Sequence, residues 1–171
     1  MARVRTETAT ACVHCGEPCP TPSVVDQDRA FCCHGCRTVY DLLHAHELDA
    51  YYQLESTPGI RPHDQADSSR FAYLDDRSVQ ERLLGYAGPD QRRVTFSIPQ
   101  IHCSACIWLL ENLYTIECGI TDSRVDFPRR ELTVTFDPES LSLRHLVERL
   151  ASLGYEPDIR LASLEKKPKD R

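Results

Sequence analysis

The stretch RRVTFSIPQIHCSACIWLL, residues 92–110, decides how the fold of the second half of the chain is read. Apolar and polar side chains alternate through residues 94–98, which predicts a strand, and the proline that follows ends it. Cys103 and Cys106 come next, and the apolar spacing over 107–117 predicts a helix. The sequence therefore places two cysteines, with two residues between them, between a strand and the N-terminus of a helix.

The pattern after this helix gives the rest of a small domain. Alternating apolar residues over 123–127 and 132–136 predict two more strands, and the apolar stripe over 143–153 predicts a second helix. Ile159 and Leu161 are predicted to form a last edge strand. The order is βαββαβ, so we expect an α+β sandwich of about 70 residues with both helices on one face of an antiparallel sheet.

The composition of the whole chain excludes several classes of function. Its 171 residues carry 20 basic and 26 acidic side chains, a formal net charge of −6, so no nucleic-acid surface is expected. The longest apolar run, residues 105–110, is far shorter than the roughly 20 residues that span a bilayer. Residues 1–10 are polar and lack the apolar core of a signal peptide. We therefore expect a cytoplasmic protein with no membrane-inserted segment in this chain.

The nine cysteines fall into two groups, which indicates two modules. Six lie between Cys12 and Cys36, three lie between Cys103 and Cys118, and the 66 residues between the groups contain none. In a reducing compartment such clusters indicate metal ligation or redox chemistry rather than a disulfide framework. The first module opens with short, proline-rich sequence, and a helix is predicted over 35–54.

The chemistry of Cys103 and Cys106 favours a soft metal ion. Amides at a helix N-terminus stabilise thiolates, and thiolates select soft ions such as Cu(I). Two sulfurs satisfy a nearly linear Cu(I) ion, whereas a structural Zn(II) ion takes four ligands. The spacing alone also fits half of a zinc site or a thiol–disulfide redox pair. The βαββαβ order favours metal binding, because a thioredoxin-like fold begins with a βαβ unit and a parallel sheet.

Residues around the cysteine pair also resemble a known family. The segment QIHCSAC, residues 100–106, resembles the Gly-Met-Thr-Cys-x-x-Cys signature of heavy-metal-associated domains. The Gly-Ile pair at 119–120 and the Leu-Gly-Tyr at 153–155 resemble two later motifs of that family. The resemblance covers residues 91–162, and it implies a ferredoxin-like fold.

The resemblance also implies roles for single residues. The two signature cysteines of the family bind the ion, so Cys103 and Cys106 are expected to bind Cu(I). The aromatic residue of the late motif packs beside the metal loop, which predicts that position for Tyr155. His102 precedes the first cysteine, and contact with the ion or proton donation is its alternative role, but it is interpreted as an exposed loop residue. Cys118 is interpreted as a small buried residue.

The first module contains a second candidate metal site. The segment Cys-Val-His-Cys at 12–15 predicts a knuckle, and Phe-Cys-Cys-His-Gly-Cys at 31–36 supplies the second half of a Cys₄ zinc site at a helix start. A resemblance to treble-clef modules that end in Phe-Cys-x-x-x-Cys implies four ligands: Cys12, Cys15, Cys32 and Cys36. Cys33 is the alternative to Cys32. Cys19 and His14 are interpreted as loop residues, although Cys33 or Cys19 would make the module a second Cu(I) site.

The two modules together resemble the N-terminal cytosolic region of a bacterial heavy-metal (copper) P-type ATPase, of the kind that serves cytochrome oxidase assembly. The resemblance implies a regulatory or delivery module that accepts Cu(I) from a copper chaperone or glutathione and hands it to the membrane part of the ATPase. The sequence lacks an Asp-Lys-Thr-Gly phosphorylation motif, so the chain is not expected to be an enzyme itself. Two alternatives are a thiol–disulfide oxidoreductase that uses Cys103 and Cys106, and a zinc-built protein-interaction module.

These interpretations divide the chain into five parts. The linker contains a short helix predicted over 71–86. The parts are a flexible tail (1–10), a Cys-rich metal-binding module (11–56), the linker (57–90), a heavy-metal-associated domain (91–162) and a charged tail (163–171).

Overall fold

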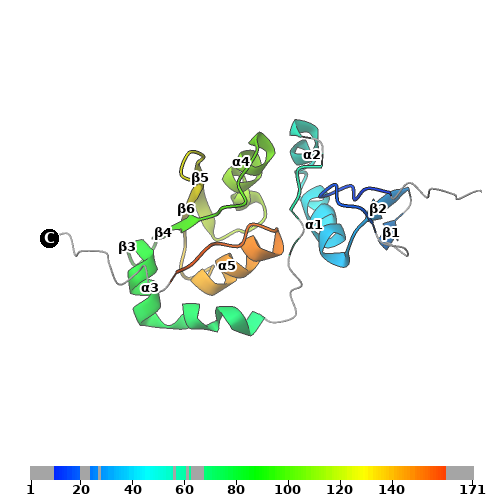
Figure 1. Ribbon diagram of the computed structural model, residues 1–171. Coiled ribbons are helices and arrows are strands. Elements are labelled where there is room, and N and C mark those ends of the chain that lie inside the picture. Colours follow the sequence, from blue (N-terminus) through cyan, green and yellow to red (C-terminus); the bar gives the residue numbers. More distant parts are fainter. Residues whose placement is uncertain are drawn as a thin grey trace, which may run out of the picture.

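The computed structural model describes residues 10–19, 24–26, 28–55, 57–60, 62 and 68–160, so nearly all of the two predicted tails lies outside the described residues (Figure 1). No helix within these ranges is both long and apolar enough to cross a membrane. The elements, in chain order, are β1 (Val24–Asp26), β2 (Arg29–Phe31), α1 (His34–Ala45), α2 (Ala50–Leu54), the 3₁₀ segment η1 (Ser68–Asp75), α3 (Arg77–Leu83), β3 (Leu84–Ala87), β4 (Arg92–Ser97), α4 (Ser104–Glu111), the 3₁₀ segment η2 (Leu113–Thr115), β5 (Ile120–Asp126), β6 (Glu131–Phe136) and α5 (Leu143–Ser152).

A four-stranded antiparallel sheet forms the centre of the second module. Its strand order is β3-β4-β6-β5. In β4, buried Val94 and Phe96 alternate with exposed residues and lie opposite Val134 and Leu132 of β6. The period of two therefore places the apolar side chains of neighbouring strands on one face, where they contact the core-facing residues of the helices. The predicted α+β, ferredoxin-like fold class is confirmed.

The edge strand next to β4 comes from a different place in the chain than expected. It is β3, whose Leu84 and Ala87 pair with Val94 and Arg92 of β4. The helix predicted over 71–86 therefore gives way to strand at its end. The expected last strand is not formed by Ile159, and Leu161 lies outside the described residues. Because β3 already pairs with β4, the segment after α5 contributes a backbone hydrogen bond to the end of that strand rather than a ladder.

The helix predicted over 35–54 is two helices, because the chain turns sharply after α1. Glu47 adopts a positive φ of 58°. Its N–H donates to the carbonyl of His44 (3.1 Å), and the N–H of Leu48 donates to the carbonyl of Leu43 (2.8 Å). These two bonds are those of a Schellman motif, which ends a helix and redirects the chain. The turn sends α2 away from the axis of α1.

The helices of the first module share a core with the second module. Buried Val39 and Leu43 of α1 and Tyr51 of α2 belong to the same apolar cluster as Leu109 of α4. Figure 1 shows α2 beside α4, between the hairpin of the first module and the sheet of the second. Burying one such side chain stabilises the fold by about 2 kcal/mol. The two modules are therefore packed together and not only tethered.

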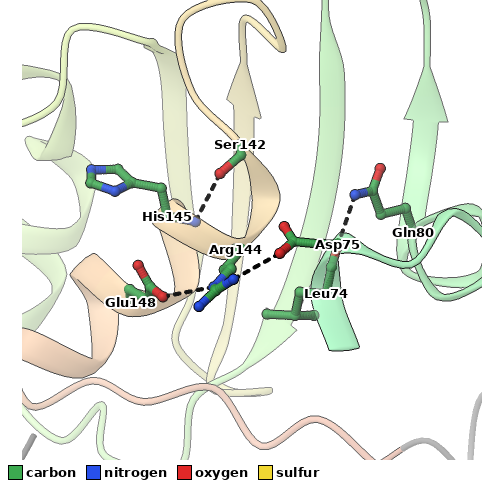
Figure 2. Close-up of polar contacts among 7 residues, drawn as sticks. All are labelled: Leu74, Asp75, Gln80, Ser142, Arg144, His145 and Glu148. Atoms are coloured by element: carbon green, nitrogen blue, oxygen red, sulfur yellow. Dashed lines mark hydrogen bonds and ion pairs between the residues drawn. The ribbon is translucent and has the colours of Figure 1, made fainter. Parts of the chain in front are cut away.

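Part of the predicted linker is also packed against the second module. Arg144 of α5 donates to Asp75 of η1 (2.8 Å) and to Glu148 of its own helix (2.9 Å), and Figure 2 shows these contacts. Leu74, beside Asp75, is fully buried. Asp76 then caps α3 by accepting from the N–H of Ser78. Thus η1 packs against α5, and β3 completes the edge of the sheet.

Candidate metal centres

The first candidate centre begins with a tight knuckle at Cys12 and Cys15. The N–H of Cys12 donates to the carbonyl of Glu17 (2.8 Å), and the N–H of Gly16 donates to the carbonyl of Cys12 (2.9 Å). Gly16 has a φ of 77°, a conformation that glycine adopts without steric cost. The knuckle therefore turns both cysteine side chains toward one point.

The hairpin β1–β2 brings the second pair of cysteines to the same point. The N–H of Val13 donates to the carbonyl of Ala30 in β2 (3.0 Å), which fixes the knuckle against the hairpin. Cys32 follows β2 directly, and Cys36 lies in the first turn of α1. The sequence predicts the knuckle and the helix start of this treble-clef-like module, and the structure adds the hairpin between them.

The sulfur atoms of the four predicted ligands lie close together. All four Sγ atoms lie within 4.8 Å of one another. The distance from Cys32 is 3.6 Å to Cys15 and 3.5 Å to Cys36, and Cys15 and Cys36 are 3.8 Å apart. A tetrahedral zinc ion with Zn–S bonds of about 2.3 Å requires sulfurs about 3.8 Å apart. These three distances therefore fit a single four-coordinate ion, although the ligand assignment itself stays a prediction.

The neighbouring cysteines have other places in this module. The Sγ of Cys33 accepts from the N–H of Cys36 (3.4 Å) and so caps α1. It lies 3.9 Å from the Sγ of Cys32, at the edge of the four-sulfur group. Cys19 is buried in the same apolar cluster. The geometry therefore favours Cys32 over Cys33 as the fourth ligand.

Burial is the main influence on the pKa values of these thiols. It raises the pKa of Cys32 and of Cys36 above the ordinary thiol value. Burial acts in the same direction on Cys12, but hydrogen bonds from the backbone N–H groups of Cys15, Cys32 and His14 outweigh it and lower the pKa of Cys12. A bound cation would offset the cost of burying the thiolates, so a metal ion would stabilise this cluster.

The second candidate centre lies where β4 leads into α4. Cys103 is the residue that precedes the first turn of α4, with extended backbone angles, and Cys106 lies in that turn. Their Sγ atoms are 3.2 Å apart. Cys106 is fully buried, whereas Cys103 is half-buried, and burial raises the pKa of Cys103 to about 11. Cys106 is thus enclosed in the fold, and Cys103 is partly accessible.

The side chain of His102 lies beside this cysteine pair. Its side chain is exposed, as expected, but its Nδ1 lies 3.4 Å from the Sγ of Cys106 and 2.8 Å from the carbonyl oxygen of Gln100. The three side chains His102, Cys103 and Cys106 can each present a ligand atom within 4.8 Å of the others. Direct adjacency to Cys103 was the signal available in the sequence. His102 is therefore a candidate third ligand.

Two tyrosines complete the surroundings of Cys106. The O–H of Tyr155 donates to the Sγ of Cys106 (3.2 Å), which confirms that Tyr155 packs beside the metal loop. The hydroxyl of Tyr51 lies 2.7 Å from that of Tyr155. Burial raises the pKa of both phenols, so both keep their protons. Tyr51 was missed in the sequence, which holds no local signal for a contact across 104 positions. Cys118 is exposed, so the expectation that it is buried is wrong.

Two family models match the two modules in this order. "Putative metal-binding domain of cation transport ATPase" matches residues 11–87, and "Heavy-metal-associated domain" matches residues 95–156. A mercuric transport protein periplasmic component from Shigella flexneri is 34% identical over 68 residues, which cover 39% of this chain and 74% of that protein. The chain belongs to the heavy-metal-associated domain family. Its two matched regions together correspond to the N-terminal region of a heavy-metal P-type ATPase.

Two further proteins are similar to part of this chain. The mercuric transport protein periplasmic component of Shewanella putrefaciens is 29% identical over 77 residues, which cover 45% of this chain and 82% of that protein. The crystal structure of oxidized MerP from Ralstonia metallidurans CH34 is 30% identical, covers 41% of this chain and 97% of that chain, and gives a TM-score of 0.38. The names of these mercuric transport proteins concern a heavy metal.

Proposed function

We propose that this chain accepts Cu(I) at Cys103 and Cys106 and hands it to the membrane part of a copper-transporting P-type ATPase. The observation that carries the proposal is the asymmetric sulfur pair, with Cys106 buried, Cys103 half-buried and the two Sγ atoms 3.2 Å apart. The buried sulfur would hold the ion, and the accessible side at Cys103 would allow an incoming thiolate to attack the metal ion. Such an arrangement supports transfer better than permanent storage.

The donor set supports a soft monovalent ion. Thiolates are soft ligands, and Cu(I) accepts low coordination numbers, whereas Zn(II) in a structural site takes four ligands. His102 supplies at most one further donor within the 4.8 Å group. The mercuric relatives carry their name from another thiophilic ion, so the family relationship is consistent with soft-metal binding and does not by itself select copper.

We further propose that Cys12, Cys15, Cys32 and Cys36 hold a structural Zn(II) ion. The four sulfurs form a closed group in which three members are buried. A zinc ion there would fix the knuckle, the hairpin and the start of α1 in one unit. The module from 11 to 56 would then present α1 and α2 as a rigid surface to the domain from 91 to 162.

The proposed partners follow from the transfer step. A copper chaperone or glutathione would supply Cu(I) as a thiolate complex, and the membrane part of the ATPase would receive it. The site of action would be the cytoplasmic side of the inner membrane. In this scheme the chain binds and delivers the ion, and the chemistry of ATP hydrolysis belongs to other parts of the pump.

An anaerobic Cu(I) titration of the full chain against a chromogenic chelator tests the function. The double variant Cys103→Ser plus Cys106→Ser is expected to lose one tightly bound Cu(I) per chain. Cys118→Ser is the matched control, because Cys118 is exposed and lies outside both sulfur groups. Retention of the same number of tightly bound Cu(I) ions in the double variant would refute the proposal. Zinc analysis of Cys32→Ser and Cys33→Ser tests the first module, and only the former is expected to lose zinc.

A thiol–disulfide oxidoreductase is the second candidate, because two sulfurs 3.2 Å apart can form a disulfide with little movement. Both functions use the thiolate of Cys103, so the pKa of this residue, which burial raises to about 11, does not separate them. An insulin-reduction assay separates the two functions. Catalytic turnover that depends on Cys103 would favour the oxidoreductase.

A further inference from the structure

A chain of buried hydroxyl groups connects the second metal centre to the first module. The O–H of Tyr155 donates to the Sγ of Cys106 at 3.2 Å, and the hydroxyl of Tyr51 lies 2.7 Å from that of Tyr155. All three side chains have no exposed surface. Water therefore cannot replace either hydroxyl without opening the core.

The backbone holds Tyr155 in this place through a second Schellman motif at the end of α5. The N–H of Gly154 donates to the carbonyl of Ala151 (3.0 Å), and the N–H of Tyr155 donates to the carbonyl of Leu150 (2.9 Å). Gly154 has a φ of 92°. The ring of Tyr155 thus leaves the helix in a direction that the backbone fixes, toward the sulfur of Cys106.

Tyr51 arrives from the other module. It lies on α2, which follows the turn at Glu47 and packs beside α4 (Figure 1). A second contact joins the same two elements, because the hydroxyl of Ser104 donates to the carboxylate of Glu55 (3.3 Å). The position of α2 relative to the metal loop is therefore set by several contacts and not by the tyrosine pair alone.

The direction of the hydrogen bonds follows from the chemistry of a thiolate. A metal-bound sulfur accepts hydrogen bonds and does not donate them, so the proton between Tyr155 and Cys106 belongs to Tyr155. The oxygen of Tyr155 is then free to accept the proton of Tyr51. Two O–H groups that point the same way polarise each other, which strengthens the bond that reaches the sulfur.

We infer that Tyr51 and Tyr155 are positioning residues for the metal site at Cys103 and Cys106, and that the first module completes this site by supplying Tyr51. The inference rests on the proposed function, because it needs the ion to bind at these two cysteines. It assigns to the first module a role beyond its own sulfur cluster. Docking of α2 orients and stabilises the buried sulfur and so sets how tightly the ion is held.

The test uses the full chain with Tyr51→Phe, Tyr155→Phe and both changes together. Removing an outer hydrogen bond to a metal ligand weakens metal binding on the order of 10-fold, which is the loss expected for Tyr155→Phe. Tyr51→Phe is expected to give a smaller loss in the same direction. The double variant is expected to bind no more weakly than Tyr155→Phe, because Tyr51 acts only through Tyr155. The thiolate-to-metal absorption band is expected to shift in each variant.

Tyr52→Phe is the matched control. It lies next to Tyr51 on the same helix, but its hydroxyl is hydrogen-bonded to the Nδ1 of His14 (2.8 Å) and not to the chain that reaches Cys106. Its loss should leave the Cu(I) affinity of the second site and the absorption band unchanged. An equal loss of affinity in Tyr52→Phe would indicate general loosening of α2 and overturn the inference.

The outcomes also separate this inference from the proposed function. Wild-type affinity and an unshifted band in both Tyr51→Phe and Tyr155→Phe would overturn the inference, while the loss of one Cu(I) on replacing Cys103 and Cys106 would leave the function standing. Unchanged Cu(I) binding in the cysteine variant would remove the function itself. Thermal unfolding of each variant confirms that affinities are measured on folded protein.

Discussion

Replacing Gly154 with alanine probes the turn that aims Tyr155 at the metal loop. Gly154 has a φ of 92°, where an L residue is strained. A Cβ at this position would also lie 2.6 Å from the carbonyl oxygen of Ile60 and 3.0 Å from its Cβ. Neither of these two atoms of Ile60 lies at the end of a flexible side chain, so the backbone itself must shift.

The expected cost has two parts. The left-handed conformation costs an alanine about 1 kcal/mol or more. The close approach to Ile60 adds strain of the same order, about 2 kcal/mol. We therefore expect Gly154→Ala to lower the free energy of unfolding by about 3 kcal/mol, which corresponds to a fall in Tm of about 6–12 °C for a chain of this size.

The assay is thermal and urea unfolding of the full chain, followed by circular dichroism under identical metal and reductant conditions. Gly85→Ala in β3 is the matched control, because a Cβ there would meet only the carbonyl oxygen of Arg93, at 3.9 Å. That variant should unfold within about 1 kcal/mol of wild type. If Gly154→Ala unfolds at the same temperature as Gly85→Ala, the reasoning about the turn is refuted.

Three further predictions concern other parts of the fold. Leu43→Ala should cost about 3 kcal/mol in urea unfolding, because Leu43 is fully buried in the shared core; a loss below about 1 kcal/mol would contradict this. His102→Ala should weaken Zn(II) binding more than Cu(I) binding at the second site, since imidazole suits zinc, and equal losses in competition titrations would exclude the third-ligand role. Asp76→Ala should destabilise the chain at neutral pH. Because hydrogen bonds from Ser78 lower the pKa of Asp76, its contribution is present above about pH 4 and is lost as the pH falls through the folded-state pKa, so wild type and variant should converge in acid.

Local periodicity was enough to predict the elements around the second metal centre. The strand over 94–98 corresponds to β4, and the stripe over 143–153 corresponds to α5. In both, one face is buried and the other is exposed, so the spacing of apolar residues carries the information. The cysteine pair was equally visible, because the two sulfurs are brought together within one helical turn and need no distant partner.

Features that use an unusual residue at a turn, or that depend on contacts with distant parts of the chain, were not predicted from the sequence. The turn between α1 and α2 has Glu47 at the position where glycine is usual, so the sequence shows no stop signal there. The short strand β3, Leu84–Ala87, gains its hydrogen bonds from β4 and has little strand pattern of its own. The contact between Tyr51 and Tyr155 is a product of tertiary packing alone.

The two sulfur groups differ in a way that suits two different tasks. In the first, four sulfurs surround one point, so an ion held there would have the four ligands of a structural zinc site, although Cys15 is half-buried. In the second, Cys106 is buried and Cys103 is half-buried, which leaves one side accessible. Exchange of a metal between proteins requires an intermediate that both share, and the second group, with two sulfurs, leaves coordination positions free for a partner's thiolate. The four-sulfur group therefore suits a structural ion that holds α1 and α2 in place. Tyr51 on α2 then connects this module to Cys106 through its hydrogen bond with Tyr155.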